Sequence, residues 1–253
     1  MKVALCLYGT IGGAGGKSGD SNDSQLDVFR HAFPHYQKFI LEKNNVDVFI
    51  HSWDLGIEKD VVSNYKPKIS EFEKQIVFDI PEHIEKSQRV QNHFSRWYSC
   101  KKVISFKRKF EEENKFKYDF VMLTRQDLAW QKDIIFSDYN NEYFYVADWY
   151  QHHTGEPMGY PKGNYNKSLQ DVWFFSNSDY MDEVSNIYDN IPHFHKENSS
   201  LSGYKGISNH RLLYHKLTKM NIIPDKLRFS FRFDRLGYLD SPLVRWLYFG
   251  DNT

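Results

Sequence analysis

Asp127 is the residue whose type and position in this sequence point most directly to chemistry. It closely follows the apolar run YDFVMLT (residues 118–124), which is typical of a buried β-strand. A carboxylate at the end of such a strand lies at the sheet edge where open α/β folds bind ligands. We expect Asp127 to hold Mg²⁺ or Mn²⁺ against a diphosphate there, with Arg125 neutralising phosphate charge. The alternative is that both residues only pair with their neighbours at a strand end.

A second group of residues lies where an acceptor molecule would bind. Asp171 begins the run DVWFF (residues 171–175), so we expect it across the crevice from Asp127, as a base that removes a hydroxyl proton. Asp148 is a further candidate carboxylate, Trp149 could stack on a base or sugar, and His153 lies in the loop that follows. The alternative for Asp171 is a capping or turn role at the start of a strand.

The glycine-rich stretch GTIGGAGGKSGDS (residues 9–21) follows the apolar run KVALCLY (residues 2–8). Its backbone N–H groups and Lys17 could approach a nucleotide. A Walker A loop needs a glycine five positions before Gly16, but Ile11 stands there. The alternatives of a mobile surface loop and of a nucleotide-dependent phospho- or sulfotransferase that uses the Gly9–Ser18 loop stay open.

Apolar patterning predicts one α/β domain over residues 1–253, with a mostly parallel central sheet flanked by helices. The opening strand, glycine loop, helix and strand are the first unit of a doubly wound fold. Expected strands cover residues 2–8, 46–53, 69–79, 118–124, 142–149 and 171–175, with another after residue 227. Expected helices cover residues 26–40, 92–114, 178–189 and 206–221, and Pro34 is expected to kink or restart the first.

Composition narrows the class of function. The chain has 33 basic and 33 acidic residues, which gives no electrostatic case for nucleic acid. Basic residues between 101 and 109, followed by acidic residues 111–113, are expected to form a solvated helix face. No apolar run spans a bilayer, and buried free Cys6 and Cys100 fit a cytoplasmic protein, with peripheral membrane recruitment left open. The high aromatic share of 17% leaves a non-catalytic sugar-binding module as an alternative.

The histidines do not indicate a zinc site. There are eleven, but they lack the cysteine partners of structural zinc sites and the HExxH frame of zinc enzymes. His210 remains a candidate ligand or base.

Five blocks resemble, in order, a group of GT-A-type glycosyltransferases from bacteria and large viruses that build surface glycans and polysaccharides. The blocks are the opening strand with its small-residue loop, VDVFIHSWD (46–54), WYSCKKV (97–103) leading to YDFVMLTRQDL (118–128), QDVWFFS (170–176) followed by SDYMDEV (178–184), and NHRLLYHKLTKMNI (209–222). The sequence departs from the group at Arg125, where a first aspartate is usual, and at Asn209 and His210, where Pro-Glu is frequent.

The resemblance implies a GT-A-like fold, a nucleotide-diphospho-sugar donor, a DxD-like motif at residues 125–127 and transfer to a hydroxyl of a glycan acceptor. Residues 1–130 would bind the donor and residues 131–253 the acceptor. The expected donor-binding residues are Tyr8, Gly9, Thr10, Lys17, Ser52, Trp53, Arg96, Arg125 and Asp127, and the expected metal ligands are Asp127 and His210.

Overall fold

The fold is described from a computed structural model of the whole chain. It describes residues 1–11, 22–130, 132–150, 169–197, 208–234 and 246–249. For residues 22–24, 148–150, 229–234 and 246–249 it describes the backbone only. Lys17 and His153 therefore lie outside the described residues.

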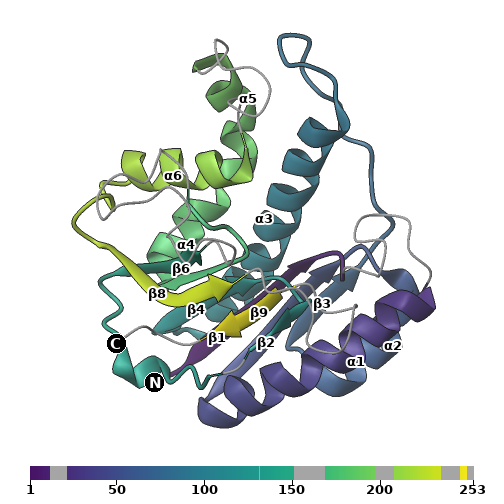
Figure 1. Cartoon of the computed structure of the whole chain (residues 1–253), viewed down its shortest axis with the longest axis vertical. Coiled ribbons are helices and arrows are strands. Elements are labelled where there is room, and N and C mark those ends of the chain that lie inside the picture. Colours follow the sequence, from purple (N-terminus) through teal and green to yellow (C-terminus); the bar gives the residue numbers. More distant parts are fainter. Residues whose placement is uncertain (12–21, 131, 151–168, 198–207, 235–245, 250–253) are drawn as a thin grey trace.

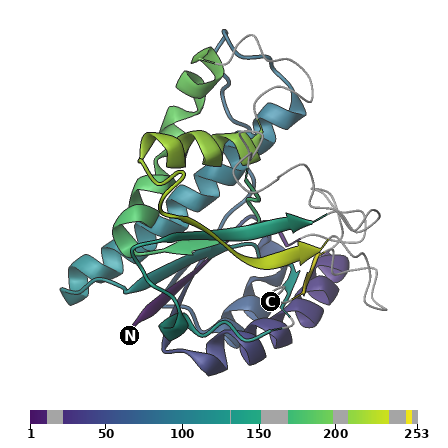
Figure 2. The ribbon, with the colours of Figure 1, turned by 60° about the vertical axis from the view of Figure 1, so that its left-hand side comes forward.

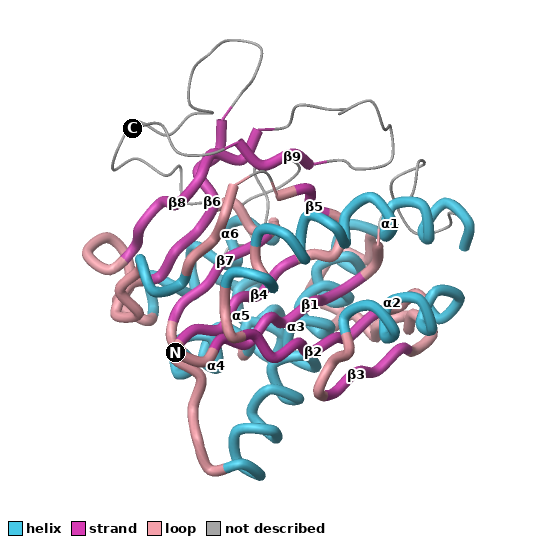
Figure 3. Tube along the Cα trace, turned by 90° about the horizontal axis from the view of Figure 1, so that it is seen from below, coloured by secondary structure: helices cyan, strands magenta, loops and turns pink. Residues whose placement is uncertain are grey.

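In the described part of the chain, nine strands form one sheet in the order β3-β2-β1-β4-β7-β6-β8-β9-β5. Their bounds are β1 Val3–Gly9, β2 Val46–Ser52, β3 Ile69–Phe72, β4 Phe120–Thr124, β5 Leu128–Ala129, β6 Phe144–Tyr150, β7 Trp173–Ser176, β8 Leu227–Asp234 and β9 Trp246–Phe249. Strands β3, β2, β1 and β4 are mutually parallel and lie side by side in Figure 3. Strand β6 is parallel to β8, and β5 to β9. The exceptions are β7, antiparallel to β4 and β6, and β8, antiparallel to β9.

Helices cover both faces of this sheet. Their bounds are α1 Asn22–Phe39, α2 Glu58–Tyr65, α3 Gln88–Asn114, α4 Ser178–Ser185, α5 Ile187–Glu197 and α6 Asn209–Lys219, with 3₁₀ turns at Leu41–Lys43, Leu55–Ile57 and Phe136–Asp138. Figures 1 and 2 show α1 and α2 on one face and α3 to α6 on the other. The predicted α/β class, with its mostly parallel sheet and flanking helices, is confirmed. None of the described helices is both long and apolar enough to cross a bilayer.

Strand β1 shows why its sequence is apolar without a break. Ala4, Cys6 and Tyr8 belong to the core under α3, whereas Leu5 and Leu7 belong to the core under α1. Successive side chains of a strand point to opposite faces, so a strand covered on both sides needs apolar residues at every position. The buried free thiols predicted for Cys6 and Cys100 are confirmed.

Several predicted elements are wrong in extent. The third strand ends at Phe72 instead of continuing to residue 79, because the backbone of Phe78 is bonded by the Gln91 side chain rather than by a neighbouring strand. The helix predicted over 178–189 is two helices, divided at Asn186, and the second continues to Glu197.

Two other expectations are corrected in part. Pro34 lies inside the continuous helix α1, so the helix does not restart there. Proline removes one helical hydrogen bond, but Pro34 and Arg30, whose carbonyl loses its partner, are both exposed, so water can replace the lost donor. The charged face predicted for α3 is not fully solvated. Lys107 and Glu111 are buried, with Lys107 Nζ 2.8 Å from Glu111 Oε2 and 2.6 Å from Asp182 Oδ1.

Candidate functional site

The site lies where four chain segments meet at one edge of the sheet. Strands β2 and β3 lie on one side of β1, and β4, which follows them in the chain, lies on the other side. The strand order therefore reverses between β1 and β4. Ligands of open α/β sheets bind outside the carboxyl ends of strands at such a point. Strand β7 is antiparallel to β4, which brings the residues before Trp173 to the same edge. There the Arg125 amide donates to the Val172 carbonyl, 3.2 Å away.

Arg125 and Asp127 form a bidentate ion pair just after β4. Arg125 Nε lies 2.7 Å from Asp127 Oδ1, and Nη2 bonds Oδ2. The Arg125 side chain is 28% exposed, whereas that of Asp127 is 1% exposed. The guanidinium therefore lies nearer the surface and the carboxylate holds it from beneath. Two parallel bonds fix the plane of the guanidinium as well as its position.

This arrangement does not fit the metal site expected at Asp127 and His210. Both Asp127 oxygens already accept from Arg125, and a cation bound there would meet the guanidinium charge. His210 Nδ1 faces the Leu169 carbonyl at 2.9 Å and Asp171 Oδ1 at 3.1 Å, not Asp127. The described residues contain no group of three or more acidic, His or Cys side chains placed to hold a metal.

Asp171 is the centre of a second buried cluster. Arg96, from α3, bonds Asp171 Oδ2 through Nη1 and Tyr8 through Nη2, whose distance to the tyrosine oxygen is 2.5 Å. The Tyr8 hydroxyl in turn donates to the Asp171 carbonyl at 3.1 Å. Burial alone would raise the pKa of Asp171, but the charge of Arg96 and the hydrogen bond from His210 lower it well below its usual range. Asp171 is therefore a firmly ionised carboxylate and a weak base.

His210 stands beside this carboxylate at the start of α6. Its Nδ1 faces two acceptors, the Asp171 carboxylate and the Leu169 carbonyl, so we assign the hydrogen of the neutral ring to Nδ1. The His210 side chain is 30% exposed and that of Asp171 is 5% exposed. As at Arg125, a buried carboxylate orients a more exposed partner.

Gly9 lies between the two clusters. Its carbonyl accepts from Ser52 Oγ at 3.0 Å and faces Gln126 Nε2 at 3.5 Å, and its N–H donates to Ser99 Oγ at 2.8 Å. Its φ of 84° lies in the left-handed region, which requires glycine as the chain leaves β1. Gln126 is buried, and its Oε1 has no hydrogen-bond partner among the described residues.

Asp54 is a site residue that sequence reasoning missed. It follows β2, and its buried carboxylate accepts from the Ile11 amide at 2.5 Å and from Gln25 Nε2 at 2.9 Å. Burial raises the pKa of Asp54 to about 7; the nearby Asp127 charge adds to this, and the hydrogen bonds partly oppose it. The signal was present in VDVFIHSWD, an apolar run followed by an acidic residue, which is the same pattern that identified Asp127.

The structure gathers some predicted residues and not others. Tyr8 and Arg96 contact Asp171, and Arg125 contacts Asp127. Gly9 and Ser52 contact each other at the same edge, where Gly9 also faces Gln126. Thr10 directly follows Gly9 and is half-buried. Trp53 is buried and stacks on Tyr98 with ring centroids 5.5 Å apart, so its ring packs inside the protein. Asp148 and Trp149 lie in β6, where only their backbone is described.

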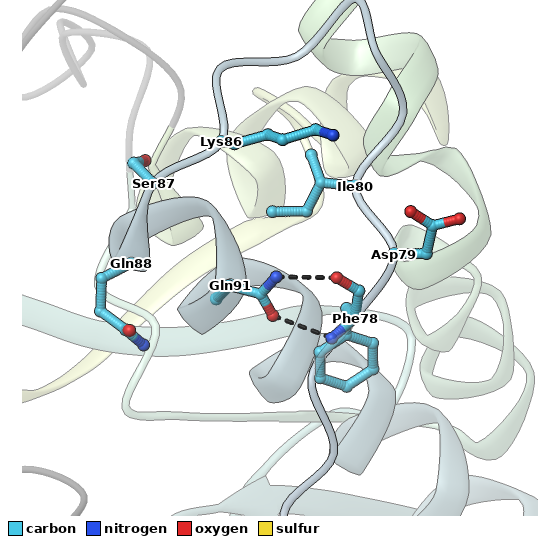
Figure 4. A pocket seen from close by; sticks show the side chains of 7 residues that line it. All are labelled: Phe78, Asp79, Ile80, Lys86, Ser87, Gln88 and Gln91. Atoms are coloured by element: carbon cyan, nitrogen blue, oxygen red, sulfur yellow. Dashed lines mark hydrogen bonds between the residues drawn. The ribbon is translucent and has the colours of Figure 1, made fainter.

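A cavity of about 310 Å³ lies beside the start of α3, lined by Phe78, Asp79, Ile80, Lys86, Ser87, Gln88 and Gln91. Figure 4 shows the Gln91 amide bonded to both backbone groups of Phe78, while the Lys86 side chain extends beside Ile80. None of the predicted site residues that the structure describes lines this cavity, although Arg96 follows Gln91 by about 7.5 Å along the same helix. The cavity thus neighbours the site without being part of it.

Comparisons with known proteins do not identify a family for this chain. No protein-family model matches the chain, and no curated protein matches it. Among solved structures, the chain is similar to a protein from Desulfovibrio desulfuricans G20 that bears the provisional name nucleotide-diphospho-sugar transferase. The TM-score is 0.46 and the sequence identity 10%, over 90% of this chain and 78% of that one. This likeness is too distant to bear on activity.

Proposed function

We propose that this protein is a glycosyltransferase that moves a sugar from a nucleotide-diphosphate donor to a hydroxyl group of a glycan acceptor. One observation carries the proposal. Two partly exposed basic side chains, Arg125 and His210, are each held by a buried aspartate at the carboxyl edge of the sheet. The ordered sequence blocks that resemble GT-A-type glycosyltransferases support the same assignment.

Arg125 is the residue we assign to the donor diphosphate. Its bonds to Asp127 use Nε and one N–H of Nη2, so within the described part of the chain Nη1 and the second N–H of Nη2 remain as donors toward phosphate oxygens. Because Asp127 holds the guanidinium in place before the ligand arrives, less conformational entropy is lost on binding. Arg125 then stabilises the negative charge that develops on the leaving diphosphate as the glycosidic bond breaks.

His210 and Asp171 together are the proposed base. With its hydrogen on Nδ1, the imidazole presents the lone pair of Nε2 to an acceptor hydroxyl. The acceptor oxygen bonds the anomeric carbon, the bond from that carbon to the diphosphate oxygen breaks, and the hydroxyl proton passes to Nε2. Asp171, which was the predicted base, instead keeps the tautomer and stabilises the imidazolium, since its own basicity is low.

No step of this proposed mechanism uses a metal ion. The chemistry that Mn²⁺ or Mg²⁺ would supply, neutralising the diphosphate, falls to Arg125 in the described arrangement. The cytoplasmic location and the division into a donor half and an acceptor half remain predictions.

The decisive experiment is a screen of UDP-, GDP-, CDP- and dTDP-sugars by thermal shift, followed by measurement of nucleotide release with and without a glycan acceptor. We expect one nucleotide class to stabilise the protein, and Arg125→Met to remove that effect. Arg108→Met is the matched control. Arg108, on α3, also pairs with an aspartate, since its Nε lies 3.1 Å from Oδ1 of Asp182 on α4, but this pair lies away from the site.

Three results would contradict the proposal. If no nucleotide sugar stabilises the protein in the thermal-shift screen, the proposed donor binding is wrong. Binding of a sugar without any turnover would favour the sugar-binding module. Nucleotide binding that depends on Lys17 and not on Arg125 would favour a phospho- or sulfotransferase built on the glycine-rich segment.

A further inference from the structure

The Asp54 carboxylate joins three segments that are separate in the sequence. It accepts from the backbone N–H of Ile11, just beyond β1, and from the side-chain amide of Gln25, in the first turns of α1. Ser52 Oγ, at the end of β2, lies 3.3 Å from Asp54 Oδ2. Asp54 is buried, so water does not compete for these bonds and each is stronger than a surface hydrogen bond.

These bonds are additional to those that build the sheet. Strands β1 and β2 are already paired in register from Val3 and Val46 to Gly9 and Ser52. Asp54 acts beyond the last of these pairs, where the backbone departs from the sheet toward residues 12–21. Ile11 precedes that segment and Gln25 follows it, so one carboxylate fixes the chain on both of its sides.

The same carboxylate is linked to the donor site through Ser52. The Ser52 hydroxyl has one hydrogen, which can go to the Gly9 carbonyl at 3.0 Å or to Asp54 at 3.3 Å. The Asp54 backbone N–H donates to Ser52 Oγ at 3.2 Å and keeps that hydroxyl in place. Gly9 also faces Gln126, which stands between Arg125 and Asp127. A short chain of contacts therefore runs from Asp54 to the residues proposed to hold the diphosphate.

We propose that Asp54 is a positioning residue of the donor site, which fixes the exit of β1 against α1 and β2 so that the nucleoside diphosphate meets a preformed surface beside Arg125. The inference rests on the proposed function. Asp54 itself does not contact the donor; it acts through Ile11, Gln25 and Ser52.

The test compares Asp54→Ala and Asp54→Asn with a matched control, Glu111→Gln. Glu111 is also buried and accepts from a backbone N–H (Tyr118, 2.8 Å), a hydroxyl (Ser178, 2.8 Å) and a side-chain nitrogen (Lys107, 2.8 Å). It lies near the C-terminal end of α3 and contacts none of the described residues of the proposed donor site. Asp54→Asn keeps the shape and one acceptor oxygen, so it gives a reading even if Asp54→Ala does not fold.

Two measurements are made on each protein. Calorimetric titration with UDP, GDP, CDP and dTDP gives the Kd, and hydrogen exchange followed by NMR gives the protection of the Ile11 amide. For Asp54→Ala we expect a Kd raised about tenfold and an Ile11 amide that exchanges at least about tenfold faster. Asp54→Asn should lie between this variant and the wild type. Glu111→Gln should change both values by less than about twofold.

The outcomes separate the two proposals. If a diphosphate binds the wild type and the Asp54 variants bind it equally well despite faster exchange at Ile11, the positioning role is overturned while the proposed function stands. If Glu111→Gln weakens binding as much as the Asp54 variants do, the effect is general destabilisation and the positioning role is again overturned. If no diphosphate binds the wild type, the proposed function fails and the role of Asp54 at a donor site fails with it.

Discussion

Asp127 holds Arg125 through both carboxylate oxygens while lying almost fully buried beneath it. The aspartate was expected to be the ligand and the arginine its helper, but the structure reverses their positions. The residue that reaches toward the surface is the arginine. What the buried aspartate contributes is the orientation of a guanidinium that would otherwise move among several rotamers.

Separate roles for Arg125 and Asp127 can be tested by comparing binding with stability. Arg125→Met should weaken nucleotide binding by tenfold or more, and it should also lower the free energy of unfolding by about 3 kcal/mol because Asp127 is left buried without a partner. The double variant Arg125→Met/Asp127→Leu should recover most of the stability and none of the binding. Calorimetric titration and urea unfolding measure the two effects. Recovery of binding in the double variant would contradict the role given to Arg125.

Dependence on a divalent cation is the next property to test. Since Arg125 occupies both oxygens of Asp127, the Kd for the nucleoside diphosphate should differ by less than about threefold between a chelator and millimolar Mn²⁺. The measurement is titration of the metal-stripped protein in EDTA and then in Mn²⁺. Binding that appears only with Mn²⁺ would show that a cation displaces Arg125 or recruits ligands outside the described residues.

The base proposed at His210 should be visible in kcat and not in nucleotide affinity. His210→Ala should lower kcat by about 10²- to 10⁴-fold while the Kd for the diphosphate changes little, because the imidazole is assigned to the acceptor hydroxyl. Asp171→Asn should also lower kcat, since the imidazolium that forms at His210 then has no carboxylate beside it to stabilise it. It should also destabilise the protein, because Arg96 loses its partner. A His210→Ala variant with wild-type kcat would exclude this residue as the base.

Prediction from the sequence succeeded where a local pattern determines the structure. The apolar runs of β1, β2 and β4 identified strands buried on both faces, and this placed the residues just after β1 and β4 at one edge. Pairings across long separations were not predictable in this way. Arg96 lies 75 residues before Asp171, on a helix whose rotation about its own axis is set by packing against the sheet. The relative depth of Arg125 and Asp127 also depends on neighbours that no local pattern specifies.

Stability at acidic pH should depend on His93 in α3. This histidine is 3% exposed, and burial, followed by the nearby His195, lowers its pKa to about 3. The unfolded chain takes up the proton near pH 6.5 whereas the folded protein does not, so stability is lost as the pH falls from about 6.5 toward 3. At pH 5 the loss should be about 2 kcal/mol. Urea unfolding of the wild type and His93→Asn across this range measures it, and parallel curves would contradict the assignment.

Asp54 should give a slope of the opposite sign over an overlapping range. Its pKa is raised by burial to about 7 in the folded protein, so the folded state keeps a proton that the unfolded chain releases near pH 4. Its contribution to stability is therefore complete below about pH 4 and is lost as the pH rises through 7, by on the order of 4 kcal/mol in total. Asp54→Asn carries no such proton, so the stability of the wild type relative to this variant should fall steadily between pH 4 and 7. The His93→Asn comparison shows the reverse trend, which separates the two groups in one set of unfolding curves. A wild-type advantage over Asp54→Asn that stays constant with pH would mean that Asp54 is already fully ionised at pH 4, held as an anion by the hydrogen bonds from Ile11 and Gln25.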